Sequence, residues 1–207
     1  MGDTFRCRFQ REVAFPAIGS EAASRRLTDA DLIAASRTAA AQFGTVFERH
    51  FEAVHTYLQR RVGADLADDL TSDTFVQAFR ARSKYDLSHY DARPWLLGIA
   101  TNLVRHHRRA EHRRFAAYER LVSRAVQSEY REGDEPAGST GAEQGMIRTL
   151  RSLPLRDREV VFLYAWADLS YAEIARALSI PIGTVRSRLS RARERMEPNR
   201  SDRAIER

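Results

Sequence analysis

Arginine side chains dominate one short stretch, "PIGTVRSRLSRARERM", residues 181–196. Five arginines fall between residues 186 and 195, separated by serine, leucine, alanine and glutamate. A guanidinium fork pairs bidentately with phosphates and with the edge of guanine, so this composition suits contact with nucleic acid. The arginines by themselves also fit a solvated helix face that carries i, i+4 pairs such as Ser190–Glu194.

The residues before this stretch indicate how it is positioned. Ser170 and Glu173 match the capping box that marks the start of a helix, and residues 179–181 form a short break before the next one. Two short helices joined by a tight turn are the helix-turn-helix pattern, whose second helix enters the major groove of DNA. If Val185 and Leu189 point inward, the residues expected to face the duplex are Thr184, Arg186, Ser187, Ser190 and Arg191, with Arg188 on the phosphate-contacting flank.

Composition and charge limit the class of protein. The 207 residues carry a net charge of +6, are 43% hydrophobic and fit one medium domain or two small ones. Gly and Pro are scarce inside the long segments and apolar alternation is rare, so the sequence predicts an all-α fold. No apolar run approaches the roughly 20 residues that a membrane span needs, which predicts a cytoplasmic protein without membrane insertion. Cys7 is the sole cysteine, so no internal disulfide can form.

Helical periodicity divides the chain into two small helical domains joined by a flexible linker. Residues 1–27 lack a sustained period, and a first domain is expected over residues 28–115, beginning at an N-cap on Thr28 or Asp29. Residues 116–145 are expected to form the linker, because residues 128–145 are rich in Gly, Glu, Ser and Pro. Residues 146–197 form the helix-turn-helix domain, with a tail over residues 198–207.

Within the first domain, one helix is expected to end at Gly63 and the next to cover residues 65–82. Apolar side chains at three- and four-residue steps predict the buried faces of these two helices. They are Phe43, Val46, Phe47, Phe51, Val54 and Leu58 on the first helix, and Leu66, Leu70, Phe75, Val76 and Phe79 on the second. A loop then ends at Pro94, and a long helix begins with Trp95, apolar early and basic late.

Catalytic and metal-binding constellations are not evident. His106, His107 and His112 are spaced so that they do not share a helical face, and neither cysteine nor acid completes a site beside them. A nucleophile paired with a base is also missing. We therefore expect neither a metal site, nor a cofactor, nor enzymatic activity.

The stretch "LPLRDREVVFLYAWADLSYAEIARALSIPIGTVRSRLSRARERM" resembles the C-terminal promoter-recognition domain of bacterial RNA polymerase sigma factors of the extracytoplasmic-function (ECF) group. The segments "DLTSDTFVQAFRARSKYD" and "RPWLLGIATNLVRHHRR" resemble helices of the N-terminal domain of that group. The resemblance covers about residues 41–196. It implies that the N-terminal domain binds core RNA polymerase and melts the minus-ten promoter element, and that the C-terminal domain reads the minus-thirty-five element as duplex.

The resemblance also implies roles for individual residues. Asp69, Ser72 and Asp73 correspond to polymerase-binding positions, although the group usually has Gln where this chain has Ser72. Asp65 and Asp68 extend this acidic patch or simply cap a helix start. The minus-ten contacts implied are Tyr85 in the loop Lys84–Arg93, then Asn102, Arg105, Arg108 and Arg109 on the following helix. Tyr85 and Tyr90 either stack on bases or pack on the domain, and Trp95 is either core or a strand-opening wedge.

Two functional hypotheses follow. In the first, the chain is a sigma factor whose partners are core RNA polymerase, promoter DNA and an anti-sigma factor, the last implied by the resemblance. In the second, it is a helix-turn-helix transcriptional regulator that does not dock as a polymerase subunit. The N-terminal half lacks the strand–helix alternation of a receiver domain, which favours the first hypothesis.

Overall fold

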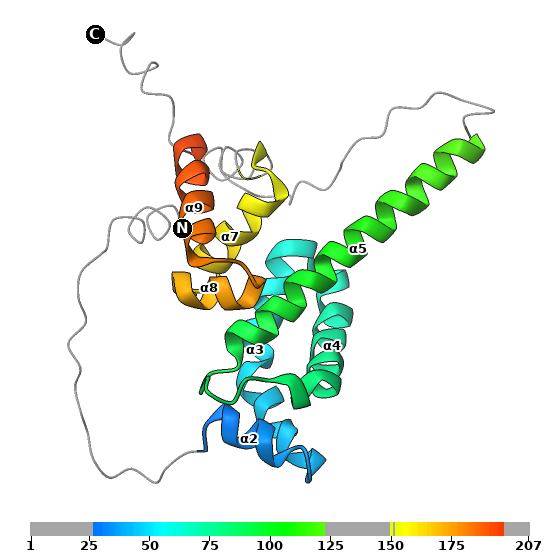
Figure 1. Ribbon diagram of the computed structural model, residues 1–207. Helices are drawn as coiled ribbons and strands as arrows, with labels where there is room; N and C mark the ends of the chain where they lie inside the picture. The colour runs from blue at the N-terminus through cyan, green and yellow to red at the C-terminus, as the bar shows by residue number, and fades with distance from the viewer. Residues whose placement is uncertain (1–26, 123–149, 151, 197–207) are drawn as a thin grey trace.

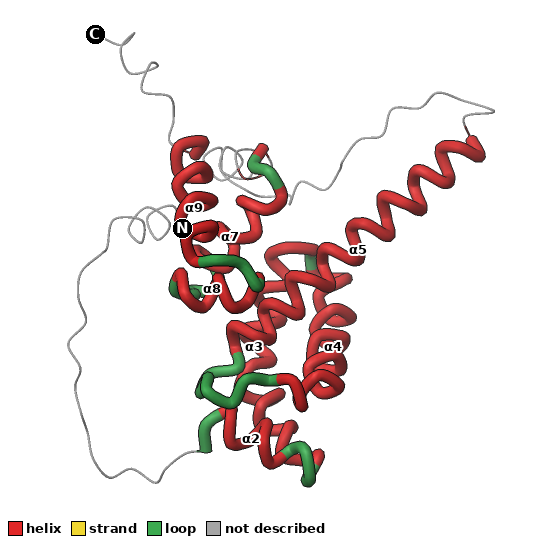
Figure 2. Tube along the Cα trace, in the orientation of Figure 1, coloured by secondary structure: helices red, strands yellow, loops and turns green. Residues whose placement is uncertain are grey.

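The computed structural model describes residues 27–122, 150 and 152–196, and every regular element within them is a helix (Figure 1, Figure 2). The predicted all-α fold is confirmed. The N-terminal half contains α2 (Asp29–Ala35), the 3-10 helix η1 (Ala40–Gln42), α3 (Phe43–Val62), α4 (Ala64–Ala81), the 3-10 helix η2 (Arg82–Lys84) and α5 (Arg93–Val122). The C-terminal half contains α7 (Leu155–Ala165), α8 (Tyr171–Leu178) and α9 (Ile182–Met196).

Local sequence signals set the helix ends in the N-terminal half. Thr28 caps α2, because its hydroxyl accepts the Asp31 N–H while the Asp31 carboxylate accepts the Thr28 N–H at 2.9 Å. Helix α3 ends before Gly63, whose φ of 84° is a conformation that side-chain-bearing residues rarely adopt. Both ends agree with the sequence prediction.

The N-terminal core lies where α3, α4 and α5 meet. Val46, Leu58, Leu96 and Val104 are completely buried there, and apolar burial of this kind is the main force that holds short helices together. Trp95 packs its ring 4.9 Å from the ring of Tyr85 and is half-buried, as expected for a residue at the edge of the core. This packing favours the prediction that Trp95 is a core residue and not a strand-opening wedge.

Helix α5 is longer than the sequence indicated. It continues to Val122, so its last turns occupy residues 116–122, which were assigned to the linker. The sequence "FAAYERLV" consists largely of good helix formers, and no Gly or Pro stops the helix. The rest of the predicted linker, the extension at residues 1–26 and the tail from residue 197 lie outside the described residues.

The two halves of the molecule pack against one another, with α8 lying across α5 (Figure 1). The crossing is close: a Cβ added to Gly98 of α5 would lie 2.3 Å from the backbone oxygen of Ala177 in α8. Arg61 of α3 stacks its guanidinium 5.0 Å from the ring centre of Phe162 in α7. The domains are therefore docked, and the face of α5 toward α8 is covered.

Candidate nucleic-acid interface

Helices α8 and α9 form the helix-turn-helix that the sequence predicted. The Ser170 hydroxyl accepts the Glu173 N–H, and the Glu173 carboxylate accepts the Ser170 N–H at 2.7 Å. The hydroxyl of Ser170 and its backbone donate to this carboxylate and hold the pKa of Glu173 below its usual value, although burial acts in the opposite direction. Ser179 adopts the left-handed conformation, with φ of 53°, and turns the chain toward α9.

Helix α9 is two-sided. Val185, Leu189 and Ala192 are buried against α7 and α8, so the predicted inward registry is confirmed. Arg186, Ser187 and Ser190 are exposed on the other side. A shallow hollow of about 250 Å³ opens on this exposed side. Its lining includes Arg193, which the sequence placed on the phosphate-contacting flank, and Tyr171, which was not among the predicted contacts. Tyr171 is the first residue of α8. The periodicity of α9 therefore could not indicate that Tyr171 lies beside its exposed side.

Three of the predicted duplex contacts are held by other parts of the domain or are partly covered. Arg191 donates from its Nη2 to the buried Asp157 carboxylate at 3.1 Å, and this hydrogen bond raises the pKa of Arg191. Arg188 and Thr184 are half-buried, and Arg188 lies 3.4 Å from the carbonyl oxygen of Arg156. The guanidinium of Arg191 therefore ties α9 to α7, while 51% of this side chain remains exposed.

The predicted minus-ten residues on α5 divide into two sets. Asn102 and Arg109 are exposed. Arg105 instead donates from Nε to the Glu159 carboxylate of α7 at 2.5 Å, with a second contact from its Nη2. Glu159 is 0% exposed, and its hydrogen bonds raise the pKa of Arg105. Arg108 donates to the carbonyl of Arg61, and burial lowers its pKa.

The loop between η2 and α5 separates its two tyrosines. Tyr85 is buried, and its hydroxyl donates to the carbonyl of His89 at 2.6 Å. Burial and the nearby carboxylates of Asp29 and Asp91 raise the pKa of Tyr85 to about 12. Tyr90, by contrast, is 73% exposed. Of the two aromatic rings considered for base stacking, Tyr85 is thus packed on the domain and Tyr90 offers an open ring.

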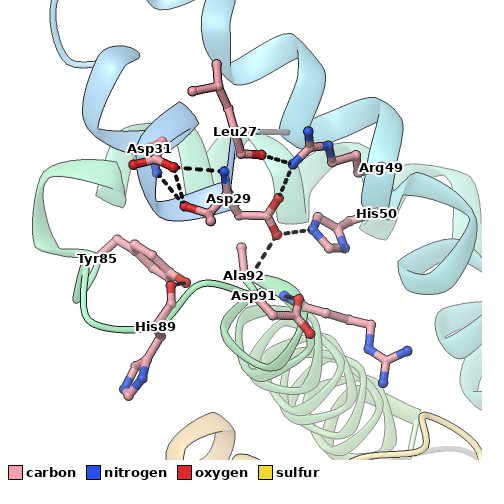
Figure 3. Close-up of polar contacts among 11 residues, drawn as sticks. Leu27, Asp29, Asp31, Arg49, His50, Tyr85, His89, Asp91 and Ala92 are labelled. Atoms are coloured by element: carbon pink, nitrogen blue, oxygen red, sulfur yellow. Dashed lines mark hydrogen bonds and ion pairs between the residues drawn. The ribbon is translucent and has the colours of Figure 1, made fainter. Parts of the chain in front are cut away.

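Asp29 lies at the centre of a polar cluster beside this loop (Figure 3). Its Oδ2 accepts from His50 Nε2 at 2.5 Å and from the Ala92 N–H at 3.0 Å, and its Oδ1 accepts from Arg49 Nη1 at 3.0 Å. Burial would raise the pKa of Asp29, but the hydrogen bonds from His50 and Ala92 outweigh it and lower the pKa to about 2. Sequence spacing does not place these residues together.

Asp29, His50 and Asp91 also have the donor atoms of a metal site, all within 4.8 Å of one another. The surroundings do not suit a cation. Both oxygens of Asp29 already accept hydrogen bonds, and the Arg49 guanidinium brings a positive charge to 3.0 Å. This arrangement is that of a satisfied structural carboxylate.

The predicted polymerase-binding residues Asp69, Ser72 and Asp73 are exposed on α4. Ser72 also lines an apolar groove between α3 and α4, with Phe43, Phe47, Phe75, Val76, Phe79 and Arg80. The assignment of Phe47, Phe51 and Val76 to the buried faces was wrong, since each is at least 40% exposed. They lie at the edges of their apolar stripes, where no further helix of the described part covers them.

Asp68 adds to this acidic surface and accepts a hydrogen bond from His55 at 2.8 Å. Within the described residues, no helix is long and apolar enough to cross a membrane.

Comparison with known proteins supports the division of the chain into an N-terminal and a C-terminal domain. Residues 46–114 match the family model "Sigma-70 region 2", and residues 144–196 match "Sigma-70, region 4". The chain is 34% identical over 152 residues to RNA polymerase sigma factor HrpL of Pseudomonas syringae pv. syringae, covering 70% of this chain and 80% of HrpL. It is 30% identical over 164 residues to the ECF RNA polymerase sigma-E factor of Escherichia coli K12, covering 75% and 84%.

Two solved structures share the fold of this chain. CnrH, determined in complex with the cytosolic domain of CnrY, aligns with a TM-score of 0.55 at 25% identity, covering 81% of this chain and 94% of that one. RpoE of Bartonella quintana, determined with the anti-sigma factor NepR, shares the fold with a TM-score of 0.53. Both sigma-70 regions occur here in order, and the matched relatives are covered over most of their length. The chain therefore belongs to the ECF group of RNA polymerase sigma factors.

Proposed function

We propose that this chain binds core RNA polymerase through the α3–α4 surface and selects promoters with α9, α5 and the loop before α5. The proposal rests on two surfaces that occur in one chain. One is the arginine-rich face of α9, and the other is the acidic and apolar surface on α4. The chain is an initiation factor and not an enzyme, so polymerase forms the bonds and this subunit selects where.

At the minus-thirty-five element, we assign base and near-base contacts to Arg186, Ser187 and Ser190. These side chains lie on the exposed side of α9, opposite Val185 and Leu189. Arginine recognises guanine through its fork, and a serine hydroxyl donates to phosphate oxygens and either donates to or accepts from base edges. Thr184, Arg188 and Arg191 lie at the edge of the same surface. There a side chain either contacts a DNA phosphate or packs on α7.

At the minus-ten element, Asn102 and Arg109 are the open positions on α5, and Tyr90 is the open aromatic ring in the preceding loop. An amide reads an adenine edge, and an aromatic ring stacks on an unpaired base. Arg105 is committed to Glu159 in the docked conformation. The Nε and Nη2 of Arg105 are therefore free for DNA only when the α5–α7 ion pair opens, whereas its Nη1 donates to the Oδ1 of the exposed Asn102 at 3.2 Å. Arg108 lies in the same covered region.

The polymerase surface combines the carboxylates of Asp69 and Asp73 with the apolar groove beside Ser72. A groove with exposed aromatic rings and a charged rim has the composition of a protein interface. Ser72 is smaller than the Gln usual in the group, and the apolar lining of the groove offers contact area that does not depend on this side chain.

Substituting Val76→Glu is expected to weaken binding to core polymerase about tenfold, because a charge would be desolvated in the groove. Val76 is 46% exposed, so the free protein should keep its stability. Gln77→Glu, one residue along and also exposed, adds the same charge as a matched control. Binding is measured by fluorescence anisotropy of labelled protein with core enzyme. Equal affinities for both variants would show that the groove is not part of the interface.

The function as a whole is tested by run-off transcription with core polymerase over a library randomised at both promoter elements. We expect transcripts from templates enriched for two short motifs at constant spacing, because core polymerase would hold both domains at a fixed separation. A regulator that does not dock on polymerase would bind DNA without directing initiation by core enzyme. Absence of initiation above core polymerase alone, with the protein folded by circular dichroism, would refute the proposal.

We further propose that the chain acts in the cytoplasm and is held by an anti-sigma factor. The support is that CnrH and RpoE were solved in complexes, the former with the cytosolic domain of CnrY and the latter with an anti-sigma factor.

A further inference from the structure

The loop between η2 and α5 is held in one shape by hydrogen bonds between its side chains and its backbone, and by residues outside it. The Asp86 carboxylate accepts the Ser88 N–H at 3.0 Å, and the Asp91 carboxylate accepts the Arg93 N–H at 2.8 Å. Tyr85 ties its hydroxyl to the His89 carbonyl. Only the ring of Tyr90, among the aromatic residues of this loop, projects into solvent. A fixed backbone that presents one open ring is what a stacking platform needs.

Asp29 connects this loop to the rest of the domain at two points. Its backbone N–H donates to the Tyr90 carbonyl at 3.1 Å, and its carboxylate accepts the Ala92 N–H at 3.0 Å. The two hydrogen bonds lie on either side of Asp91, so they fix the peptide groups that follow the Tyr90 ring. The carboxylate itself is 7% exposed and is clamped to α3 by Arg49 and His50 (Figure 3).

Helix α2 alone does not explain this arrangement. The capping box of α2 is complete with Thr28 and Asp31, so the helix start does not require the Asp29 carboxylate. That carboxylate turns away from its own helix. It bonds to His50 of α3, 21 residues along the chain, and to Ala92 of the loop, 63 residues along, and so joins α3 to the loop. Charge-assisted hydrogen bonds to a buried carboxylate are among the stronger polar contacts in proteins.

We propose that Asp29 is a positioning residue that preorganises the loop carrying Tyr90 for contact with the melted minus-ten strand. This inference rests on the proposed function, because it assumes that Tyr90 meets single-stranded promoter DNA. Asp29 itself touches no DNA: it holds the Tyr90 backbone so that binding does not have to order the loop.

The test uses holoenzyme and a promoter probe that is pre-melted over the minus-ten element. Asp29→Ala should weaken binding to this probe about tenfold, since ordering the loop then consumes binding free energy. In a Tyr90→Ala background the same change should have less than about twofold effect, because the ring it positions is gone. Asp29→Asn keeps the shape and one acceptor, so it should fold normally, give an intermediate loss and speed hydrogen exchange at the Ala92 amide.

Asp31→Asn is the matched control, because it weakens the capping box in the same first turn of α2. It should leave probe binding within about twofold of wild type. If Asp29→Ala and Asp29→Asn bind like wild type, or if the loss persists undiminished with Tyr90→Ala, the positioning role is overturned while the proposed function stands. If wild-type holoenzyme does not bind the pre-melted probe, the proposed function fails and this role fails with it.

Discussion

Replacing Gly98 with alanine is expected to separate the two halves of the molecule, although glycine-to-alanine exchange inside a helix ordinarily stabilises. The new methyl group would lie 2.3 Å from the Ala177 carbonyl oxygen and 3.1 Å from its carbon. Carbon–oxygen contacts in proteins are ordinarily about 3.3 Å or longer. The atoms in the way are backbone atoms of α8, so no side chain can swing aside, and the helices must move apart.

The expected size follows from two opposing effects. Overpacking of this kind costs about 1–3 kcal/mol, and more where the backbone has to shift. Alanine in place of glycine inside a helix stabilises that helix by about 1 kcal/mol. This gain is the same whether the domains are docked or apart, so it does not affect docking. Docking should therefore weaken by about 2 kcal/mol or more, which is roughly a 30-fold change in the ratio of docked to separated molecules.

Gly44→Ala is the matched control. Gly44 also lies inside a helix, α3, and an added Cβ there meets nothing within 4 Å. Docking is followed by energy transfer between dyes on cysteines introduced at Gln77 of α4 and Arg195 of α9, both exposed, after Cys7→Ser. We expect Gly98→Ala to lose energy transfer at lower urea concentration than wild type, and Gly44→Ala to match wild type. Unchanged transfer in Gly98→Ala would contradict the close crossing of α5 and α8.

The second large effect is an asymmetry between the two partners of the Arg105–Glu159 ion pair. The Glu159 carboxylate is completely buried, whereas the Arg105 side chain is 25% exposed. Arg105→Met should disfavour docking by about 3 kcal/mol, because it leaves a buried charge without a partner. Glu159→Gln should cost only about 1 kcal/mol, since the guanidinium can turn to water and the amide can still accept a hydrogen bond.

The same dye pair measures both variants. Glu159→Met, measured alone and in combination with Arg105→Met, completes a double-mutant cycle. With neither charge left, the combined variant should dock better than Arg105→Met alone, giving a coupling energy of about 2 kcal/mol. Additive effects of the two changes would mean that the side chains do not interact across the domain boundary. The result also bears on the proposed promoter contact, because opening this pair would free the Nε and Nη2 of Arg105.

Local rules predicted several helix ends, although not the end of α5 at Val122. Thr28 with Asp31, and Ser170 with Glu173, are capping boxes whose donors and acceptors lie three residues apart, so the pattern and the geometry coincide. Gly63 ends α3 because its backbone adopts a conformation in which a side chain would be strained. The inward registry of Val185 and Leu189 followed from the 3.6-residue period in the same way.

The edges of the apolar stripes did not follow from these rules. Phe47, Phe51 and Val76 have the helical spacing of core residues but are exposed, because burial at a stripe's edge depends on which neighbouring helix covers it. Tyr85 and Tyr90 lie five residues apart in one loop, and only the packing of Tyr85 on Trp95 decides which ring stays open. The sequence placed Tyr85 among the minus-ten contacts, whereas the structure buries its ring and leaves that of Tyr90 exposed.

The amino-acid sequence by itself determined the all-α class, the helix-turn-helix, the sided arginine helix and the family. Each depends on residues within a few positions of one another or on a motif read in order. Only the tertiary structure decided that Arg105 is paired with Glu159, that Gly98 lies beneath α8 and that Asp29 holds the loop of Tyr90. These contacts join residues 54 to 79 positions apart, or a loop to a distant helix, and periodicity along one helix carries no information about a partner on another.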